Sequence, residues 1–255
     1  MKGKSPSITS RLWACFSVLG VVLLWQLLTG TGMIDAYLLP SPLMVGRAFF
    51  TELPSLIEHS KITLSEAFTG LGLGILLGFF MAVIMDQLEP LYQALYPLVI
   101  LTQTVPTVAI APLLVLWFGY EMTPKVILIV VTTFFPITVG LLSGFKSADP
   151  DAVSLLRAMG AGKGQIFFYI KLPQAMDQFF SGLRISASYA VVGAVISEWL
   201  GGFGGLGVYM TRVKKAFSFD KMFAVILLIS AISLLLMSGV DILERLCMPW
   251  KRIKN

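Results

Sequence analysis

Charge is scarce in this sequence. Only 13% of its 255 residues are charged, whereas 56% are hydrophobic and the mean hydropathy is +0.85. A soluble domain usually has about a quarter of its residues charged, so this chain has too little charge to cover a water-facing surface. The scarcity excludes an ordinary soluble domain and favours a protein embedded in a membrane.

Cysteine and histidine are also nearly absent, with Cys15, Cys247 and His59 as their only occurrences. Three such residues provide neither a disulfide framework nor a cluster of metal ligands. We interpret the cysteines as small apolar residues and His59 as a solvated or interfacial residue. The sequence therefore predicts no metal site and no cofactor in this chain. It also lacks the converging nucleophile, base or metal ligands that a membrane enzyme would need.

Long apolar runs dominate the rest of the chain. A helix needs about 20 apolar residues to cross a hydrocarbon layer of ~30 Å. The sequence has six such runs, at Leu12–Leu28, Ile62–Met85, Leu91–Phe118, Val126–Phe145, Phe179–Leu200 and Met222–Leu246. The first run lacks a small-residue cleavage site, so we predict a retained span rather than a signal peptide. The pattern predicts an all-α, polytopic membrane protein with about six transmembrane helices in one domain, 1–255.

Lysine and arginine are unevenly distributed over the two sides that these spans define. The net charge of +5 does not indicate a nucleic-acid partner, because membrane proteins need basic residues for orientation. With the N-terminus inside, the cytoplasmic side receives the larger share, including Lys2, Lys4, Arg11, Lys251, Arg252 and Lys254. The outer side receives Lys125 and a basic group formed by Arg212, Lys214, Lys215 and Lys221. We predict that both termini are cytoplasmic.

The second span contains Gly70, Gly74 and Gly78 at four-residue spacing. Small residues at this spacing let two helices approach closely in lipid, so we interpret them as a packing face. No strand precedes these glycines, and this excludes a dinucleotide-binding fingerprint.

The third span is interrupted by Pro97, Pro106 and Pro112. Proline removes a backbone hydrogen bond and kinks a helix, which a membrane tolerates only where protein or water satisfies the freed carbonyl group. We therefore expect this span to face the interior of the bundle and to line a path. Gln103 and Thr104 place an amide and a hydroxyl group beside Pro106. They either bind a polar solute or satisfy the carbonyl group that the proline frees.

The outer end of the fifth span contains an acidic residue, Glu198, beside Trp199. An ionisable group at membrane depth usually faces a cavity or a partner. The alternative is an interfacial ion pair with a basic residue near Arg212, and the sequence leaves both possibilities open.

The segment that follows, residues 201–207, is too rich in glycine to remain helical. We interpret it as a flexible outer gate that includes Gly205 and extends to Met210. A simple connecting turn is the alternative.

The longest hydrophilic stretch is the predicted cytoplasmic loop 146–177, between the fourth and fifth spans. Asp149 or Ser147 is suited to cap a short helix that has Pro150 in its first turn. Apolar residues then recur on one face, at Val153, Leu156 and Met159. This pattern predicts a short amphipathic helix that either lies on the bilayer or docks in a groove of a partner protein.

Glycines at 160, 162 and 164 are expected to end that helix, and a second apolar face follows over Ile166–Ile170, until Pro173. The string from Gly160 to Gly164 is not a phosphate-binding loop. Arg157 stands where that motif needs glycine, and Gly164 stands where it needs serine or threonine. The prediction is therefore a helix–glycine–helix segment that does not bind ATP.

The interval from Gly160 to Ile170-Lys-Leu-Pro173, a glycine, nine residues and then Ile-x-Leu-Pro, resembles the loop signature of ABC importer permeases. Ser154-Leu155-Leu156 stands where the family usually has Glu-Ala-Ala. Further motifs are similar to the nitrate, sulfonate and taurine branch: Leu38-Leu-Pro-Ser-Pro42, Pro106 with Ala111-Pro-Leu, Trp117-Phe-Gly119, and Ser197-Glu-Trp-Leu-Gly-Gly with Gly205-Leu-Gly207. The resemblance extends from about Leu12 to Leu246.

This resemblance implies a type I importer permease in a bacterial inner membrane. The solute would be small and polar or anionic, of the sulfonate, taurine, nitrate or pyrimidine class, and the stretch Ser197–Met210 is most similar to members assigned to pyrimidine precursors of thiamine. The implied partners are a second copy of the permease, an extracytoplasmic substrate-binding protein, and a cytoplasmic ATPase dimer that binds ATP and magnesium. The basic group would then either dock the binding protein, attract an anionic solute or be solvated.

The family's coupling helix would correspond to the loop described above. The residues implied to contact the ATPase are Asp151, Ser154, Leu155, Arg157, Ala158, Gly160, Ala161, Ile170, Leu172 and Pro173. The path would involve the third to fifth spans, with Gln103, Thr104, Pro106, Glu198, Trp199, Gly205 and Met210 as candidates. An ion-coupled secondary transporter is the alternative, but it would need internal repeats and more intramembrane carboxylates than Glu198.

Overall fold

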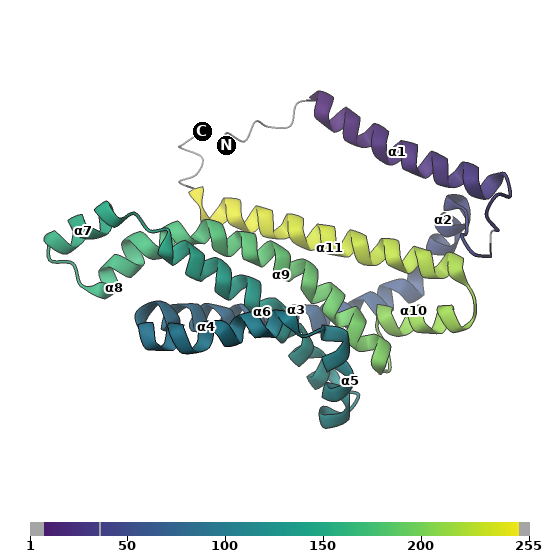
Figure 1. The fold of residues 1–255 in the computed structure, drawn as a ribbon. Coiled ribbons are helices and arrows are strands. Elements are labelled where there is room, and N and C mark those ends of the chain that lie inside the picture. Colours follow the sequence, from purple (N-terminus) through teal and green to yellow (C-terminus); the bar gives the residue numbers. More distant parts are fainter. Residues whose placement is uncertain (1–7, 36, 250–255) are drawn as a thin grey trace. The chain divides into compact units, whose positions relative to one another are not determined.

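The computed structural model describes residues 8–35 and 37–249, and every regular element in that part of the chain is helical (Figure 1). The all-α prediction is therefore confirmed. The chain divides into two units, one formed by 1–57 with 210–228, and the other by 58–209 with 229–255. The second unit contains most of the helices that the predicted path requires.

Each predicted span falls on a helix or on a pair of helices. Four helical stretches are long and apolar enough to cross a membrane: α3 (Leu53–Gln87), α6 (Met122–Lys146), Lys163–Leu200, which ends in α9 (Leu172–Leu200), and α11 (Phe219–Cys247). The pair α4 (Glu89–Thr104) and α5 (Thr107–Phe118) passes the same criteria as one broken span. The first predicted span lies in α1 (Ile8–Gly30), whose described apolar stretch, Phe16–Gly30, is shorter than the others and does not pass these criteria. The described residues therefore contain four or, with the broken pair, five of the six predicted spans.

The third span differs from the prediction of one long, kinked helix. Its two halves, α4 and α5, meet at an angle of 97°. Val105 and Pro106 adopt extended backbone angles at the break, because proline lacks an N–H donor and its ring disfavours a helical conformation in the residue before it. Pro97 and Pro112 remain inside α4 and α5. One of the three prolines therefore breaks the span, and the other two do not.

The core of the second unit is the contact between α6 and α9, which is close because small residues line it. A Cβ atom on Gly144 would lie 2.5 Å from Ala175 Cα, and one on Gly182 would lie 2.4 Å from the carbonyl oxygen of Pro136. The surrounding core consists of buried apolar residues that include Ile129, Ile137, Leu141, Phe145, Phe180, Leu183 and Val191. Small residues let the two backbones touch, as is common where helices associate in lipid.

The packing role predicted for the glycines of α3 is confirmed. A Cβ atom on Gly70 would lie 2.4 Å from Ile129 Cγ2, one on Gly74 would lie 2.1 Å from Thr133 Oγ1, and one on Gly78 would lie 2.9 Å from a carbonyl oxygen of α6. Gly72 is different, because its Cβ would have no heavy atom within 4 Å. The α3–α6 contact thus depends on the four-residue spacing and not on glycine content alone.

The first unit contains α1, α2 (Pro42–Thr51) and the adjoining parts of α3, α10 (Leu206–Lys215) and α11. Trp25 packs against Phe223 with ring centroids 5.8 Å apart, and its indole N–H donates to the carbonyl oxygen of Pro40 at 3.1 Å. Lys221 forms an ion pair with Glu52. This residue of the basic group is therefore paired within the chain, whereas Arg212, Lys214 and Lys215 are exposed.

Several sequence predictions concern positions that the structure does not describe. Lys2, Lys4, Lys251, Arg252 and Lys254 lie outside the described residues, as do the side chains of Arg11 and Cys15. The side of the membrane on which the termini lie therefore stays a prediction.

Candidate functional site

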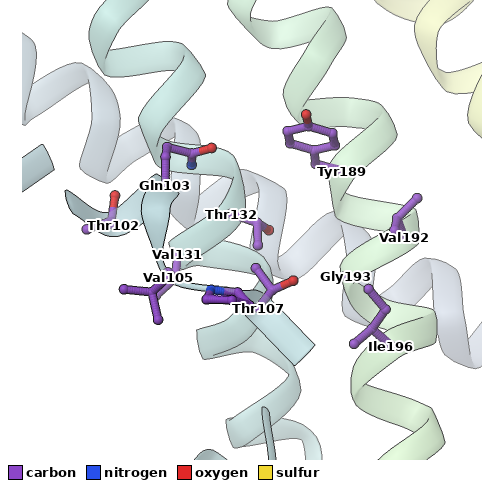
Figure 2. A pocket seen from close by; sticks show the side chains of 11 residues that line it. Thr102, Gln103, Val105, Thr107, Val131, Thr132, Tyr189, Val192, Gly193 and Ile196 are labelled. Carbon is purple, nitrogen blue, oxygen red and sulfur yellow. The ribbon is translucent and has the colours of Figure 1, made fainter. Parts of the chain in front are cut away.

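A cavity of about 310 Å³ lies at the break between α4 and α5 (Figure 2). Four helices contribute to it: the end of α4, the start of α5, the middle of α6 and the second half of α9. Its lining residues include Thr102, Gln103, Pro106, Thr107, Thr132 and Tyr189. The predicted path residues Gln103 and Pro106 therefore lie where a solute has room, whereas Thr104 is not among the lining residues.

The polar groups of the cavity are of two kinds. The hydroxyl groups of Thr102 and Thr132 donate to carbonyl oxygens of their own helices, at 2.7 Å and 2.9 Å. Thr104 does the same with Leu101, at 2.9 Å. In contrast, the Gln103 amide and the Tyr189 phenol make no hydrogen bond within the described part of the chain and remain solvent-accessible. An amide offers both donors and an acceptor, so the cavity combines an aromatic ring with a free amide group.

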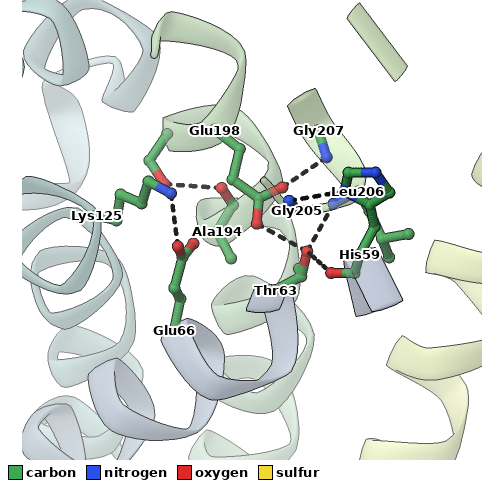
Figure 3. Close-up of polar contacts among 10 residues, drawn as sticks. His59, Thr63, Glu66, Lys125, Ala194, Glu198, Gly205, Leu206 and Gly207 are labelled. Atoms are coloured by element: carbon green, nitrogen blue, oxygen red, sulfur yellow. Dashed lines mark hydrogen bonds and ion pairs between the residues drawn. The ribbon is translucent and has the colours of Figure 1, made fainter. Parts of the chain in front are cut away.

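Glu198 does not line this cavity. It is 1% exposed, and its carboxylate accepts hydrogen bonds from Thr63 Oγ1 at 2.7 Å and from the backbone N–H of Gly207 at 2.6 Å (Figure 3). No ion pair joins it to the basic group within the described residues. Within this chain Glu198 is a buried acceptor that fixes nearby backbone, and its predicted place on the path stays a prediction. Its neighbour Trp199 is 46% exposed.

The N-terminus of α10 is capped by side chains from two other helices. The N–H groups of residues 205, 206 and 207 donate to His59 Nδ1, Thr63 Oγ1 and Glu198 Oε2 in turn. The first turn of a helix has N–H groups without intrahelical partners, and α3 and α9 here supply those partners. His59 is thus a structural acceptor and not merely a solvated residue.

The glycine stretch is anchored as a result. Gly205 has φ = +114°, and a Cβ atom there would lie 2.1 Å from Glu198 Oε1, so only glycine fits. Residues 204–207 are buried. The segment leaves the helix at 201–205, as composition predicted, and its second half is held by the contacts described above, whereas Phe203 is 91% exposed. Its role as an outer gate stays a prediction. Met210 is also buried.

A buried ion pair lies beside this region and was missed from the sequence. Lys125 Nζ is 2.6 Å from Glu66 Oε1, and both side chains are 6% exposed. Lys125 was expected in an outer loop, but α6 begins at Met122 and includes it. Glu66 lies inside the second predicted span, and an intramembrane carboxylate needs a partner. This position in the sequence is the signal from which a buried ion pair of Glu66 could have been predicted. No cluster of metal-ligating side chains occurs among residues 8–35 and 37–249.

The short helix predicted in the loop is α7 (Pro150–Ala158), and its capping is confirmed. Asp149 Oδ1 accepts from the N–H of Asp151 at 3.0 Å. Ser147, the other candidate, instead donates to the carbonyl oxygen of Gly144 at 2.8 Å. Gly160 has φ = +85° with no heavy atom near its missing side chain, which suits the end of a helix. No residue of α7 is buried.

The second helix of the loop is α8 (Lys163–Ile166), but Pro173 does not end it. A π-helical turn, Phe167–Lys171, joins α8 directly to α9. Pro173 lies in the first turn of α9, where the wider π turn accommodates the missing N–H donor. The predicted loop 146–177 is thus irregular or short-helical only up to about residue 162, and its remainder belongs to the long span.

The structure separates the predicted partner contacts into two groups. Asp151, Ser154, Leu155, Arg157, Ala158 and Gly160 are exposed, and Ala161 is half-buried. Ile170 is buried in the core of this chain, and Leu172 and Pro173 are half-buried. The first group lies on α7 and directly after it, and α7 projects beyond the ends of α6 and α9 (Figure 1), whereas Ile170 packs within the chain.

The chain is similar in sequence to known transport proteins. Residues 74–247 match the family described as binding-protein-dependent transport system inner membrane component. The formylaminopyrimidine transport permease protein ThiX of Halalkalibacterium halodurans is 38% identical over 224 residues, which cover 85% of this chain and 87% of that protein. The riboflavin transport system permease protein RibX of Chloroflexus aurantiacus is 30% identical over 233 residues, covering 91% of this chain and 87% of that protein.

A solved structure has the same fold. The inward-facing MetNI methionine ABC transporter contains a chain that superposes with a TM-score of 0.66 at 19% identity, covering 74% of this chain and 94% of that one. At this identity the likeness shows the fold alone. It confirms the predicted importer permease architecture.

Proposed function

The chain belongs to the family of binding-protein-dependent transport system inner membrane components, and is thus a transport permease and not an enzyme. We propose that its solute is a small nitrogen heteroaromatic compound of the pyrimidine type. Permeases of this family work with a substrate-binding protein and a separate ATPase. Family membership decides against an ion-coupled secondary transporter. We also propose that the permease contains two copies of this chain and that both termini of each copy are cytoplasmic.

The observation that carries the solute proposal is the cavity at the α4–α5 break. Its volume of about 310 Å³ lies at the lower end of the range of ligand pockets, roughly 300–1,000 Å³, and so suits a small molecule. The free amide of Gln103 matches the alternating donors and acceptors on the edge of an aminopyrimidine, and Tyr189 offers a ring for stacking. Two relatives are named for formylaminopyrimidine and riboflavin, both of which contain a nitrogen heteroaromatic ring.

Uptake into proteoliposomes that contain the permease, its ATPase and its binding protein tests this proposal. We expect labelled formylaminopyrimidine to enter only with ATP, and Gln103→Leu to reduce uptake by about tenfold because a buried polar edge of the solute loses its partner. Gln93→Leu in the same helix is the matched control, since Gln93 is exposed and outside the cavity. Uptake of taurine or a sulfonate in place of the pyrimidine would contradict the solute class.

The exposed face of α7 supports a further part of the proposal, that this helix docks on the ATPase. A capped helix without a buried residue has little reason to persist unless a partner covers it. Gly160 then sets the direction of the chain after the helix, with φ = +85°.

Replacing Gly160 with valine should abolish the stimulation of ATP hydrolysis by loaded binding protein while the permease still reaches the membrane. A β-branched residue at positive φ is strained, so α7 would end in a different direction. Gly164→Val is the control, because Gly164 lies in the same loop with ordinary φ and open space around it. Normal stimulation in Gly160→Val would count against docking through α7.

A further inference from the structure

The loop that contains α7 is attached to the rest of the second unit through a lysine at each end. Lys146 is the last residue of α6, and its Nζ donates to Tyr92 Oη at 2.6 Å and lies 3.8 Å from the centre of that ring. Lys171 is the last residue before α9, and its Nζ lies 2.8 Å and 2.9 Å from the two carboxylate oxygens of Asp86.

Their acceptors belong to a single turn. Asp86 is next to the last residue of α3, and Tyr92 lies in the first turns of α4. We call residues 86–92 the α3–α4 turn. Its backbone is held by hydrogen bonds from the N–H of Leu88 to Ile84 and from the N–H of Tyr92 to Leu88, at 3.1 Å and 3.0 Å. The α3–α4 turn is therefore a hydrogen-bonded connection, and both ends of the loop contact it through their lysines.

The two ends of the loop are also joined to each other. Phe145 and Phe167 are both buried, and their ring centroids are 5.2 Å apart. This contact lies close to Lys146 on one side and Lys171 on the other. The ends of α6 and α9 should consequently move together, and the α3–α4 turn should move with them.

Helix α4 connects this turn to the cavity. It runs without a break from Glu89 to Thr104, a length of roughly 24 Å at 1.5 Å per residue. Its last residues, Thr102 and Gln103, line the cavity, and the chain then bends by 97°. A displacement of the α3–α4 turn would thus change the position of Gln103, because the bend lets α4 move relative to α5.

The two contacts differ in strength. The Asp86 side chain is 9% exposed and that of Lys171 is 28% exposed, so loss of Lys171 would leave a nearly buried carboxylate without a counter-charge. Lys146 is exposed, and Tyr92 offers it a hydroxyl oxygen and a ring rather than a carboxylate, so their contact is the weaker one. The ion pair is therefore the main link.

We propose that Asp86, with Tyr92, is a positioning residue of the transport cycle, which transmits movement of the loop through Lys171 and Lys146 to α4 and the cavity. This inference rests on the proposed docking of α7 on the ATPase. It does not depend on the identity of the solute.

The test uses the complete complex of permease, ATPase and binding protein, with Gln103→Cys as a reporter in a background without Cys15 and Cys247. The rate of labelling by a water-soluble thiol reagent is measured in the resting and ATP-bound states. We expect a change in rate between the states that Asp86→Lys or Lys171→Asp reduces by about tenfold, as for residues in direct contact. The double substitution, which restores opposite charges, should recover the change.

The rate of ATP hydrolysis is measured in parallel, because it distinguishes a loss of transmission to the cavity from a loss of docking on the ATPase. The single charge reversals should keep ATP hydrolysis while they lose the labelling change. Glu89→Gln is the matched control, because it removes an acidic charge from the same turn without touching either lysine, and it should behave as wild type. An unchanged labelling response in both single variants, or no recovery in the double variant, would overturn the proposal.

These outcomes are distinct from failure of the proposed function. If formylaminopyrimidine is not transported but the charge-reversal pattern holds, the solute is wrong and the transmission stands. If Gly160→Val leaves ATPase stimulation intact, docking through α7 is wrong, and the labelling change should then persist in Gly160→Val as well.

Discussion

The two ends of α6 place their lysines in opposite surroundings. At its start, Lys125 is buried in an ion pair with Glu66, beside Glu198 and the capped backbone of residues 205–207. At its other end, Lys146 is exposed and contacts Tyr92 next to a loop that has no buried residue in α7. We call these regions the glycine end and the loop end. Their lysines are separated by roughly 30 Å of helix.

The burial of the lysine contacts decides how easily each end of the bundle can rearrange. Breaking a buried ion pair leaves an uncompensated charge in a place where water cannot solvate it, which is strongly destabilising. Exposed contacts cost little to break, because water replaces the lost partner. We therefore expect the glycine end to resist rearrangement, whereas the exposed contacts of the loop end, such as that of Lys146, can be exchanged for those of a partner protein.

The largest expected loss in the free energy of unfolding is at Lys125, at the glycine end. Lys125→Met leaves Glu66, which is 4% exposed, without its counter-charge, and we expect a loss of about 3–5 kcal/mol in the free energy of unfolding. Lys146→Met at the loop end should cost no more than about 1 kcal/mol. Chemical unfolding in detergent micelles measures both. Adding Glu66→Leu to Lys125→Met should recover most of the loss, and equal losses in the two lysine variants would refute the distinction.

Two glycines with positive φ offer the next comparison. Gly205→Ala at the glycine end adds backbone strain and a clash with the Glu198 carboxylate, so we expect a loss of about 3 kcal/mol. Gly160→Ala at the loop end adds the same kind of strain without a clash, and should cost about 1 kcal/mol. The melting temperatures of the two variants in detergent report the difference. If the two melting temperatures fall equally, the clash with Glu198 costs no stability beyond the backbone strain, and the expected difference between the two glycines is wrong.

The fold was largely accessible from the sequence because its main determinants are local. The length of an apolar run decides whether a helix can span a membrane, and all six predicted runs coincide with helices or with the α4–α5 pair. The spacing of Gly70, Gly74 and Gly78 likewise depends only on helix geometry. The cap at Asp149 follows from residue chemistry next to Pro150.

The missed features depend on contacts between distant residues. Thr63 and Glu198 are 135 positions apart, and no periodicity indicates that they bind each other and the start of α10. Lys125, near the end of a run, is indistinguishable in sequence from a lysine that reaches the interface. Pro173 stays within a continuous helical stretch because a π turn precedes it, whereas the helix breaks at Pro106, which adopts extended backbone angles. Tertiary context decided these cases.

A smaller effect is expected at Thr63, within the glycine end. Thr63→Val keeps the shape of the side chain but removes the acceptor for the N–H of Leu206 and the donor to Glu198. Both groups are buried, so we expect a loss of about 2 kcal/mol in the free energy of unfolding. Thr69→Val is the control in the same helix, because Thr69 is exposed and its hydroxyl donates to the carbonyl oxygen of Ser65 in that helix, and its effect should stay within about 0.5 kcal/mol. A similar result for both would mean that capping of α10 does not stabilise this end.

The smallest effect on stability is expected at the loop end, where it should remain local. Asp149→Ala removes the cap of α7, which costs about 1 kcal/mol of helix stability, and the amides of α7 should exchange hydrogen about fivefold faster. The melting temperature should not change, because α7 buries no residue and can open without disturbing α6 and α9. Ser147→Ala is the matched control: its hydroxyl bonds to Gly144 and not to α7, so exchange there should stay as in wild type. A fall in melting temperature for Asp149→Ala would mean that the loop end is as tightly integrated as the glycine end, and the contrast between the two would fail.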